Sequence, residues 1–469
     1  MPIFFAFLLS LFSWLNPVPA DTSPEWTKQV GAKTLPTSKT IFSASKYGAV
    51  ADGKTLATQA IQKTIDAAAK KGGVVTLAPG QYLTGSLFLK KGVTLQLDKG
   101  VTLLGSQDLK DYPEINTRVA GIEMKWPAAL INILDQDNVA ITGEGTVDGQ
   151  GKVFWDKYWA MRKDYDPKGL RWIVDYDAKR PRALLISNAS NVTVKNITLQ
   201  RSGFWTVHIL YSKNVSVEGI VVRNNLGGHG PSTDGIDIDS SSYVLVQHCD
   251  IDCNDDNFCL KAGRDADGLR VNRPCEYVLI QDCVAGAGDG LFTCGSETSG
   301  GIRHIIARRL KAKGTKTGIR IKSALTRGGV VEDVWVDDIT MENVGYGIIV
   351  TMNWNPAYSY STLPAGYSLE TAPAHWKAML TKVEPAEKGI PHFRDIHISN
   401  VQVLGAKTAI SAEGQTTSLL DGFTLDNITM TAATAGGISY ATGWSIKNVN
   451  ITAEDQEPVA VQNSQNIKF

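Results

Sequence analysis

The chain has 469 residues, with 47 acidic side chains, 47 basic side chains and 43% hydrophobic residues. It can therefore bury a large core, and its composition excludes a disordered chain. The neutral balance also excludes recognition of nucleic acid or a membrane surface through bulk charge, so an acidic ligand would need a local cluster of cations.

The first twenty residues, MPIFFAFLLSLFSWLNPVPA, are an apolar run that ends in the small-residue pattern Val18, Pro19, Ala20. The run is short for a bilayer span and is typical of a secretory signal peptide, although no Lys or Arg precedes it. An uncleaved membrane anchor is the alternative. We predict a signal peptide over 1–20, a single domain over 21–469, and a secreted or periplasmic protein with no membrane partner.

The next strong signal is an amphipathic helix in TQAIQKTIDAAAKKGG, which begins near Thr58 and is stopped by Gly72 and Gly73. Short β segments follow it, from GVVTLAPGQYLTG onward. A helix in this place would cap the open end of a solenoid, which otherwise exposes its core and a strand edge.

A repeat organises most of the remaining chain. Closely following copies recur about every 21 to 34 residues, and each alternates apolar and polar residues before a turn residue and a second short β run. The copies are NVAITG (138), NVTVKN (191), NVSVEG (214), YVLVQH (243), YVLIQD (277), HIIARR (304), DVWVDD (333), DIHISN (395), GFTLDN (422) and GWSIKN (443). Such strands bury a continuous core by stacking, so we predict an all-β parallel β-helix with a short N-terminal capping helix.

Two segments interrupt the repeat, at about 150–182 and 352–392, and both combine aromatic with charged residues. Aromatic rings on long loops can stack on sugars and wall a binding cleft. The alternative is that these loops simply pack on the solenoid.

The six cysteines fall within one short region, and the sequence does not give their pairing. No histidine pattern with metal-ligand spacing accompanies them, so we predict neither a zinc site nor another cofactor. Cys249 and Cys283 occupy equivalent places in VLVQHC and VLIQDC, which favours a stack of buried side chains over a crosslink.

The charged motifs follow the spacing of the repeat. Asp234 and Asp255 are 21 residues apart, Asp256 and Asp289 are 33 apart, and Asp289 and Arg320 are 31 apart. Residues one coil apart would stack about 5 Å from each other, so we expect these residues to form one patch. Mutual repulsion would raise the pKa of at least one carboxyl and provide a proton donor.

The cations of this patch, Arg320 and Lys322, alternate with isoleucines in GIRIKS and should point to one side of a strand. Beside an acidic cluster they suit the capture of a carboxylate ligand. Each aspartate alone could instead cap a turn, but an Asp doublet inside a β repeat, followed by RIK, points to acid/base chemistry on an anionic polymer.

At this point the chain resembles the polygalacturonases of glycoside hydrolase family 28. The resemblance runs from about Ser45 to beyond Asn355 and rests on these motifs: YGAVADG, FWTVH, HGPSTDGIDIDSS, DDNFCLKAGRDADG, GSETSGG and GIRIKS. It implies a right-handed parallel β-helix that hydrolyses α-linked galacturonate in pectic polysaccharide with inversion and without a metal, most like the bacterial exo-acting branch.

The resemblance also implies roles. Asp255 would be the general acid, Asp234 and Asp256 would activate water, and Arg320 and Lys322 would bind a galacturonate carboxylate. His229 and His208 are further candidates near the cleft.

Two positions depart from the family pattern. Ser232 stands where Asn is usual, and Asp289, in Gly-Asp-Gly, replaces the family His. Asp289 could raise the pKa of Asp255 further, change the accepted neighbour sugar, for example to rhamnose, or mark a lost activity.

Several alternatives stay open at this stage. They are a rhamnogalacturonan hydrolase of the same fold, a lyase and a non-catalytic pectin-binding solenoid. Carboxylates stacked about 5 Å apart would suggest retention by the general separation rule, whereas the resemblance implies inversion. A closed solenoid needs no partner to cover its core, so we expect a monomer.

Overall fold

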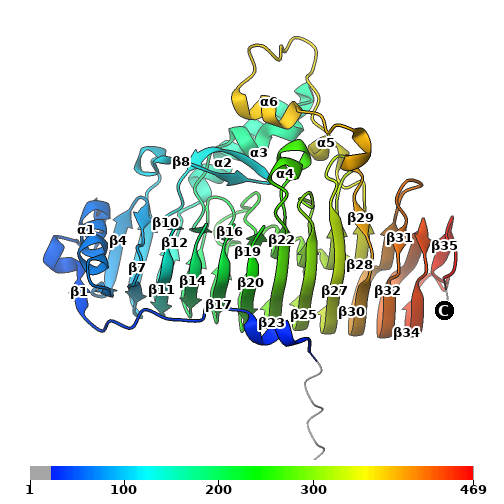
Figure 1. Ribbon diagram of the computed structural model, residues 1–469, viewed down its shortest axis with the longest axis horizontal. Helices are drawn as coiled ribbons and strands as arrows, with labels where there is room; N and C mark the ends of the chain where they lie inside the picture. The colour runs from blue at the N-terminus through cyan, green and yellow to red at the C-terminus, as the bar shows by residue number, and fades with distance from the viewer. Residues whose placement is uncertain (1–22, 468–469) are drawn as a thin grey trace, which may run out of the picture.

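The computed structural model describes residues 23–467, so the predicted signal peptide lies outside the described residues. The chain winds into a parallel β-helix whose strands form three ladders (Figure 1). The predicted all-β parallel β-helix is therefore confirmed. No helix among residues 23–467 is long and apolar enough to cross a membrane.

The first ladder contains the predicted repeat. Its strands are β1 (Ile41–Ser43), β3 (Gly73–Thr76), β6 (Val93–Leu97), β11 (Asp137–Gly143), β14 (Ser190–Lys195), β17 (Lys213–Glu218), β20 (Ser242–Gln247), β23 (Cys275–Ala285), β25 (Ile302–Lys313), β27 (Val330–Glu342), β30 (Ile396–Glu413), β32 (Thr424–Ser439) and β34 (Ser445–Ala453).

The second ladder begins with β2 (Asp52–Leu56), β4 (Gly80–Thr84), β7 (Val101–Gly105), β12 (Thr146–Asp148), β15 (Thr198–Gln200), β18 (Val221–Arg223) and β21 (Asp250–Asp252), and continues in the later parts of β23, β25 and β27.

The third ladder lies beneath the inserted segments. It contains β5 (Leu87–Phe88), β10 (Ile131–Leu134), β13 (Leu184–Ser187), β16 (Val207–Leu210), β19 (Ile236–Asp239), β22 (Asp256–Lys261), β24 (Gly290–Cys294), β26 (Thr317–Lys322) and β28 (Tyr346–Thr351), followed by the end of β30.

The register of the first ladder matches the sequence repeat. Val139 pairs with Val192, Val192 is followed by Val215, and the same row continues through Val244 and Val278. The residue that precedes this row in each of the ten repeat copies has a positive φ. Asn, Asp and Gly tolerate this left-handed conformation best, which explains why so many copies begin with them.

Three copies begin with larger residues instead. Tyr243, Tyr277 and His304 adopt positive φ, and their rings stack on one another with centroids 4.7 Å apart. Ring stacking on the surface offsets part of the cost of the left-handed backbone.

The core is a single apolar column inside the three ladders. At its N-terminal end lies α1 (Thr58–Ala69), which buries Ile61, Ile65 and Ala68 against the first coils (Figure 1). The predicted capping helix is thus confirmed. Cys249 and Cys283 stack within this column: the backbone N–H of Cys249 lies 3.4 Å from Cys283 Sγ, and all six cysteines are free thiols.

The first interrupting segment is largely helical, so its prediction as a loop was wrong, whereas the second is mostly loop with short helices. The first contains α2 (Lys152–Tyr165) and α3 (Val174–Asp177), and the second contains α5 (Pro356–Ser359) and α6 (Ala374–Leu380). In α2 the apolar residues Phe154, Trp155 and Tyr158 lie on one buried face. This packing outweighs the modest helix propensity of aromatic residues.

These helices gather on one side of the β-helix together with α4 (Asp265–Val271) and an antiparallel hairpin of β8 (Glu114–Val119) and β9 (Ile122–Pro127) (Figure 1). They pack around a second apolar cluster that includes Trp126, Trp172, Tyr176 and Trp376. Most aromatic residues of the first insert therefore pack, as the alternative interpretation held.

Candidate active site

The acidic residues lie at the starts of the third-ladder strands, either just before the strand or, for Asp256, as its first residue. Pairing of β19 with β22 places Asp234 beside Asp256, and pairing of β22 with β24 places Asp255 beside Asp289. The spacing argument had paired Asp234 with Asp255 and Asp256 with Asp289, so it was wrong by one residue. Arg320 pairs with Thr293 and not with Asp289. The side chains still meet because they reach across neighbouring coils.

Asp256 is the fixed anion of the site. Its carboxylate accepts hydrogen bonds from Arg320 Nη1 at 3.0 Å, Lys322 Nζ at 2.8 Å and Thr293 Oγ1 at 2.8 Å. Arg320 and Lys322 thus point to the same side of β26, as the alternation predicted. Both cations neutralise the carboxylate of Asp256.

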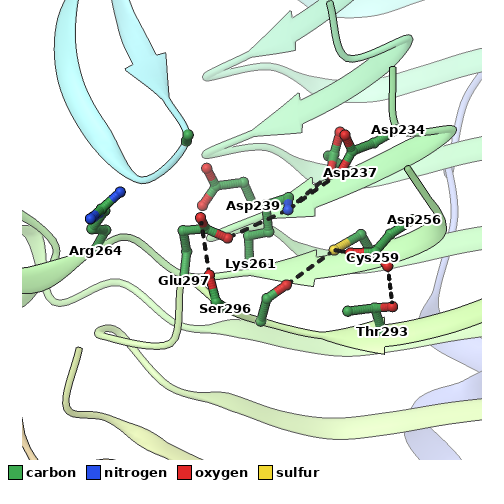
Figure 2. A network of polar contacts seen from close by, with 12 residues as sticks. Asp234, Asp237, Asp239, Asp256, Cys259, Lys261, Arg264, Thr293, Ser296 and Glu297 are labelled. Carbon is green, nitrogen blue, oxygen red and sulfur yellow. Dashed lines mark hydrogen bonds and ion pairs between the residues drawn. The ribbon is translucent and has the colours of Figure 1, made fainter. Parts of the chain in front are cut away.

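A second buried cluster lies beside the first and surrounds Lys261. Its ammonium is 3.6 Å from Asp234, 3.4 Å from Asp237 and 3.4 Å from Glu297 (Figure 2). Asp237 accepts no hydrogen bond from any residue between 23 and 467.

The sequence interpretation had not selected Lys261, Asp237 or Glu297. A signal existed for Asp237, because the alternation in IDID puts both aspartates outside the core. Glu297 lies in the loop after β24, where periodicity gives no information.

Four aspartates of the site differ in pKa: three have a raised pKa and one has a lowered pKa. Burial and the neighbouring Asp289 raise the pKa of Asp255 to about 7, and burial together with Asp256 raises the pKa of Asp237 to about 8. Burial and Asp237 also hold the pKa of Asp234 well above its ordinary value. Burial alone would raise the pKa of Asp256 too, but Lys322 and Arg320 outweigh it and hold that pKa low. The site therefore holds a fixed carboxylate beside groups that can carry a proton near neutral pH.

A pocket above these groups is lined by residues of both inserts and by Phe204 and Trp205, which precede β16. Trp205, Trp354 and Tyr358 contribute aromatic walls, and Trp354 lies over Lys322 with the ammonium 4.3 Å from the ring centroid. Two aromatic residues of the second insert therefore line the site, as the cleft interpretation expected.

One side of the pocket is braced by buried polar contacts. Ala120, at the tip of the β8–β9 hairpin, lines the pocket, and its carbonyl accepts a hydrogen bond from Tyr176 Oη at 2.8 Å. Arg264 donates to Tyr176 Oη at 2.8 Å and to the carbonyls of Tyr358 and Ser359 at 3.0 Å. One arginine thus joins the hairpin side, α3 and α5 around the pocket.

The close fit at the hairpin tip depends on Gly121, which has φ +88°. A Cβ there would lie 2.4 Å from Arg264 Cβ and 2.8 Å from Glu297 Cγ. The hairpin tip therefore packs closely against Arg264 and Glu297 on this side of the pocket.

The two positions that depart from the family pattern have partners. Ser232 donates its hydroxyl to Asp175 at 2.8 Å, and Asp289 forms an ion pair with Lys316 at 2.5 Å. Asp289 lies on the side of Asp255 that is opposite Asp234, where it lines a neighbouring groove with Arg320.

The two candidate histidines do not line the pocket. His208 is fully buried, lies 3.4 Å from Asp239 and contacts the ring of Trp205; burial lowers its pKa to about 4. His229 is exposed, hydrogen-bonds Asn254 at 2.8 Å and stacks on Trp159.

The acidic groups are close enough to chelate an ion. One atom each of Asp234, Asp255 and Asp256, and likewise of Asp234, Asp237 and Cys259, lies within 4.8 Å of the others. Lys261 and Lys322 already place positive charge at these oxygens. The expectation of a metal-independent site stays a prediction.

A parallel β-helix with a roofed pocket, a fixed carboxylate and a protonatable partner defines the class of polysaccharide-cleaving β-helix enzymes. The sequence model of Glycosyl hydrolases family 28 matches residues 75–368. The chain belongs to glycosyl hydrolases family 28 and is a glycoside hydrolase, as the sequence motifs predicted.

Named relatives agree with this assignment. A probable polygalacturonase of Vitis vinifera is 31% identical over 382 residues, which cover 77% of this chain and 74% of that protein. An exo-poly-alpha-D-galacturonosidase of Dickeya chrysanthemi is 27% identical over 349 residues, covering 67% of this chain and 57% of that protein. The crystal structure of a hyperthermoactive exopolygalacturonase from Thermotoga maritima superimposes with a TM-score of 0.76 at 25% identity, covering 91% of this chain and 95% of that one.

Proposed function

We propose that the protein is a polygalacturonase-like, exo-acting hydrolase that releases galacturonate from the chain end of pectic polysaccharide. The observation that carries this proposal is the pairing of Asp256, held ionised by Arg320 and Lys322, with Asp255, whose pKa is raised to about 7. An ionised group and a protonated group side by side are what glycoside hydrolysis requires.

Each residue then has a role. Asp255 donates a proton to the glycosidic oxygen, while the ionised Asp256 activates the attacking water and Asp234 helps to orient it. The charges of Arg320 and Lys322 extend over the face of Trp354 and offer a cationic wall to a galacturonate carboxylate. Lys261 keeps Asp234 and Glu297 in place from below.

The close packing on one side of the pocket supports exo action. In this proposal the hairpin tip and the Arg264 contacts stop a polymer from continuing past Ala120 and Tyr176, so that a chain end fits and an internal segment does not. Cleavage of polygalacturonate into monomer without intermediate oligomers tests this point. Early release of mixed oligomers would indicate endo action.

Stereochemistry is the point at which geometry and family pattern differ. Carboxylate oxygens within 4.8 Å favour retention by the separation rule, whereas the family pattern implies inversion. We propose inversion, because the fixed Asp256 is a better site for holding water than for forming a covalent bond. Proton NMR of the first-formed anomer decides between the two outcomes.

A rhamnogalacturonan-specific galacturonohydrolase of the same fold is the second candidate. The observation that favours it is Asp289, which places a carboxylate paired with Lys316 beside Asp255. A carboxylate repels a neighbouring uronate more than a neutral rhamnose. Comparing kcat/KM for galacturonate and rhamnogalacturonan oligomers separates the two substrates.

We also propose that the protein is exported after removal of 1–20, and that 21–469 acts as one domain and as a monomer. The apolar leader and its small-residue end support export. The three ladders, which share one core, support a single domain. Mass spectrometry of the secreted protein and light scattering in solution test these statements.

A further inference from the structure

A groove beside the active site crosses β26, β28 and β30. Asp289 and Arg320 line its beginning, and Lys316, Tyr346 and Lys407 line its further part. It adjoins the active site, because Arg320, which lines the groove, donates to Asp256 of the active-site pocket at 3.0 Å.

The residues along this groove occupy one row of successive coils. The row runs through Asp255, Asp289, Lys316, Gly345 and Lys407. Coils are about 4.8 Å apart, so the backbones of Lys316 and Lys407 are roughly 10 Å apart along the axis. Gly345 lies between them, so no side chain projects from the floor of the groove at that position. The neighbouring Tyr346 is 39% exposed.

The two lysines differ in their partners. Lys316 is paired with Asp289, whereas Lys407 is exposed and has no carboxylate within 4.0 Å among residues 23–467. An exposed cation beside an open floor and an exposed ring is suited to a ligand that is both anionic and sugar-like.

We propose that this groove binds the leaving-group side of an acidic polysaccharide, and that Lys407 receives the carboxylate of a uronate residue several sugars beyond the cleaved bond. The proposal rests on the proposed function and adds the length of chain that the enzyme recognises. The direction follows from the fold: the hairpin tip packs closely on the other side of the pocket at Ala120, and Asp255, as proton donor, must face the leaving oxygen.

The position of Lys407 in this row also sets the shortest oligomer that this residue can contact. Lys407 lies four coils beyond Asp255, and a hexose ring is about as long as the roughly 4.8 Å coil spacing. A dimer therefore cannot reach Lys407, whereas oligomers of about five or more residues can, with one residue before the cleaved bond and about four beyond it.

The test is steady-state kinetics of the full enzyme on galacturonate oligomers of two to six residues, with K407Q, Y346A and the control K447Q. Lys447 is exposed on β34, outside the groove, so K447Q makes the same charge change. We expect K407Q to raise KM for the hexamer roughly five- to tenfold at low salt, with KM for the dimer unchanged. Y346A should raise the hexamer KM in the same length-dependent way.

Two results would overturn the proposal. Hexamer KM values of K407Q and Y346A equal to that of K447Q would refute the groove assignment while leaving the proposed function intact. Lack of activity of the natural protein on every oligomer would instead refute the proposed function, and this inference with it.

Discussion

Substitution of Asp289 tests whether a neighbouring carboxylate raises the pKa of Asp255. A carboxylate about 5 Å from Asp255, the distance between neighbouring coils, interacts with it by about 3 kcal/mol at an effective dielectric constant of about 20. That corresponds to about two pK units. Lys316, 2.5 Å from Asp289, cancels part of this field, so we expect a net effect of about one unit.

The sign of the effect follows from the role of Asp255. A general acid works only when protonated, so kcat/KM should fall tenfold per pH unit above about 7. In Asp289→Asn the loss of a negative neighbour stabilises ionised Asp255, and the fall should begin near pH 6. In Lys316→Gln the field of Asp289 is no longer compensated, and the fall should move to higher pH.

The assay is the pH dependence of kcat/KM, with Asp98→Asn and Lys447→Gln as controls that make the same charge changes on exposed residues elsewhere. Opposite shifts of the alkaline limb in the two variants are the expected result. Shifts in the same direction, or no shift in either variant, would show that Asp255 is not the titrating acid or that Asp289 does not act on it.

Three further predictions concern the same cluster. Asp255→Asn should lower kcat on the order of 10²- to 10⁴-fold with little change in oligomer binding, measured by calorimetry, because an amide cannot donate the proton; unchanged kcat would contradict the assignment. Asp237→Asn should raise the melting temperature at pH 7 more than at pH 4. The raised pKa of Asp237 costs the folded state nothing below its unfolded pKa and about 4 kcal/mol at pH 7, and a gain that does not grow with pH would argue against this cost. Finally, EDTA should leave kcat unchanged if Lys261 and Lys322 supply the positive charge; loss of activity restored by a divalent cation would show a metal enzyme.

The sequence predicted the fold because a solenoid repeats its local rules. One apolar alternation and one left-handed turn residue recur from Asn138 to Gly443, and each copy stacks on the previous one in register. The helices at 152–165 and 174–177 were missed because their mixture of aromatic and charged residues carries no strong helix signal. The residues on which these helices pack are distant in the sequence.

The site was predicted less completely. The Asp doublet and RIK motifs identified the groups around Asp256, but the spacing argument was wrong by one residue because coil lengths vary through their loops. Glu297 and the hairpin tip at Gly121 reach the site from loops, and no local pattern places a loop in space.

The most direct test of the central claim is product analysis of the purified protein on polygalacturonate, with Asp255→Asn in parallel. We expect galacturonate monomer as the first and continuing product, and its loss in the variant. Mixed oligomers from the start, unsaturated products, or equal activity in the variant would contradict it.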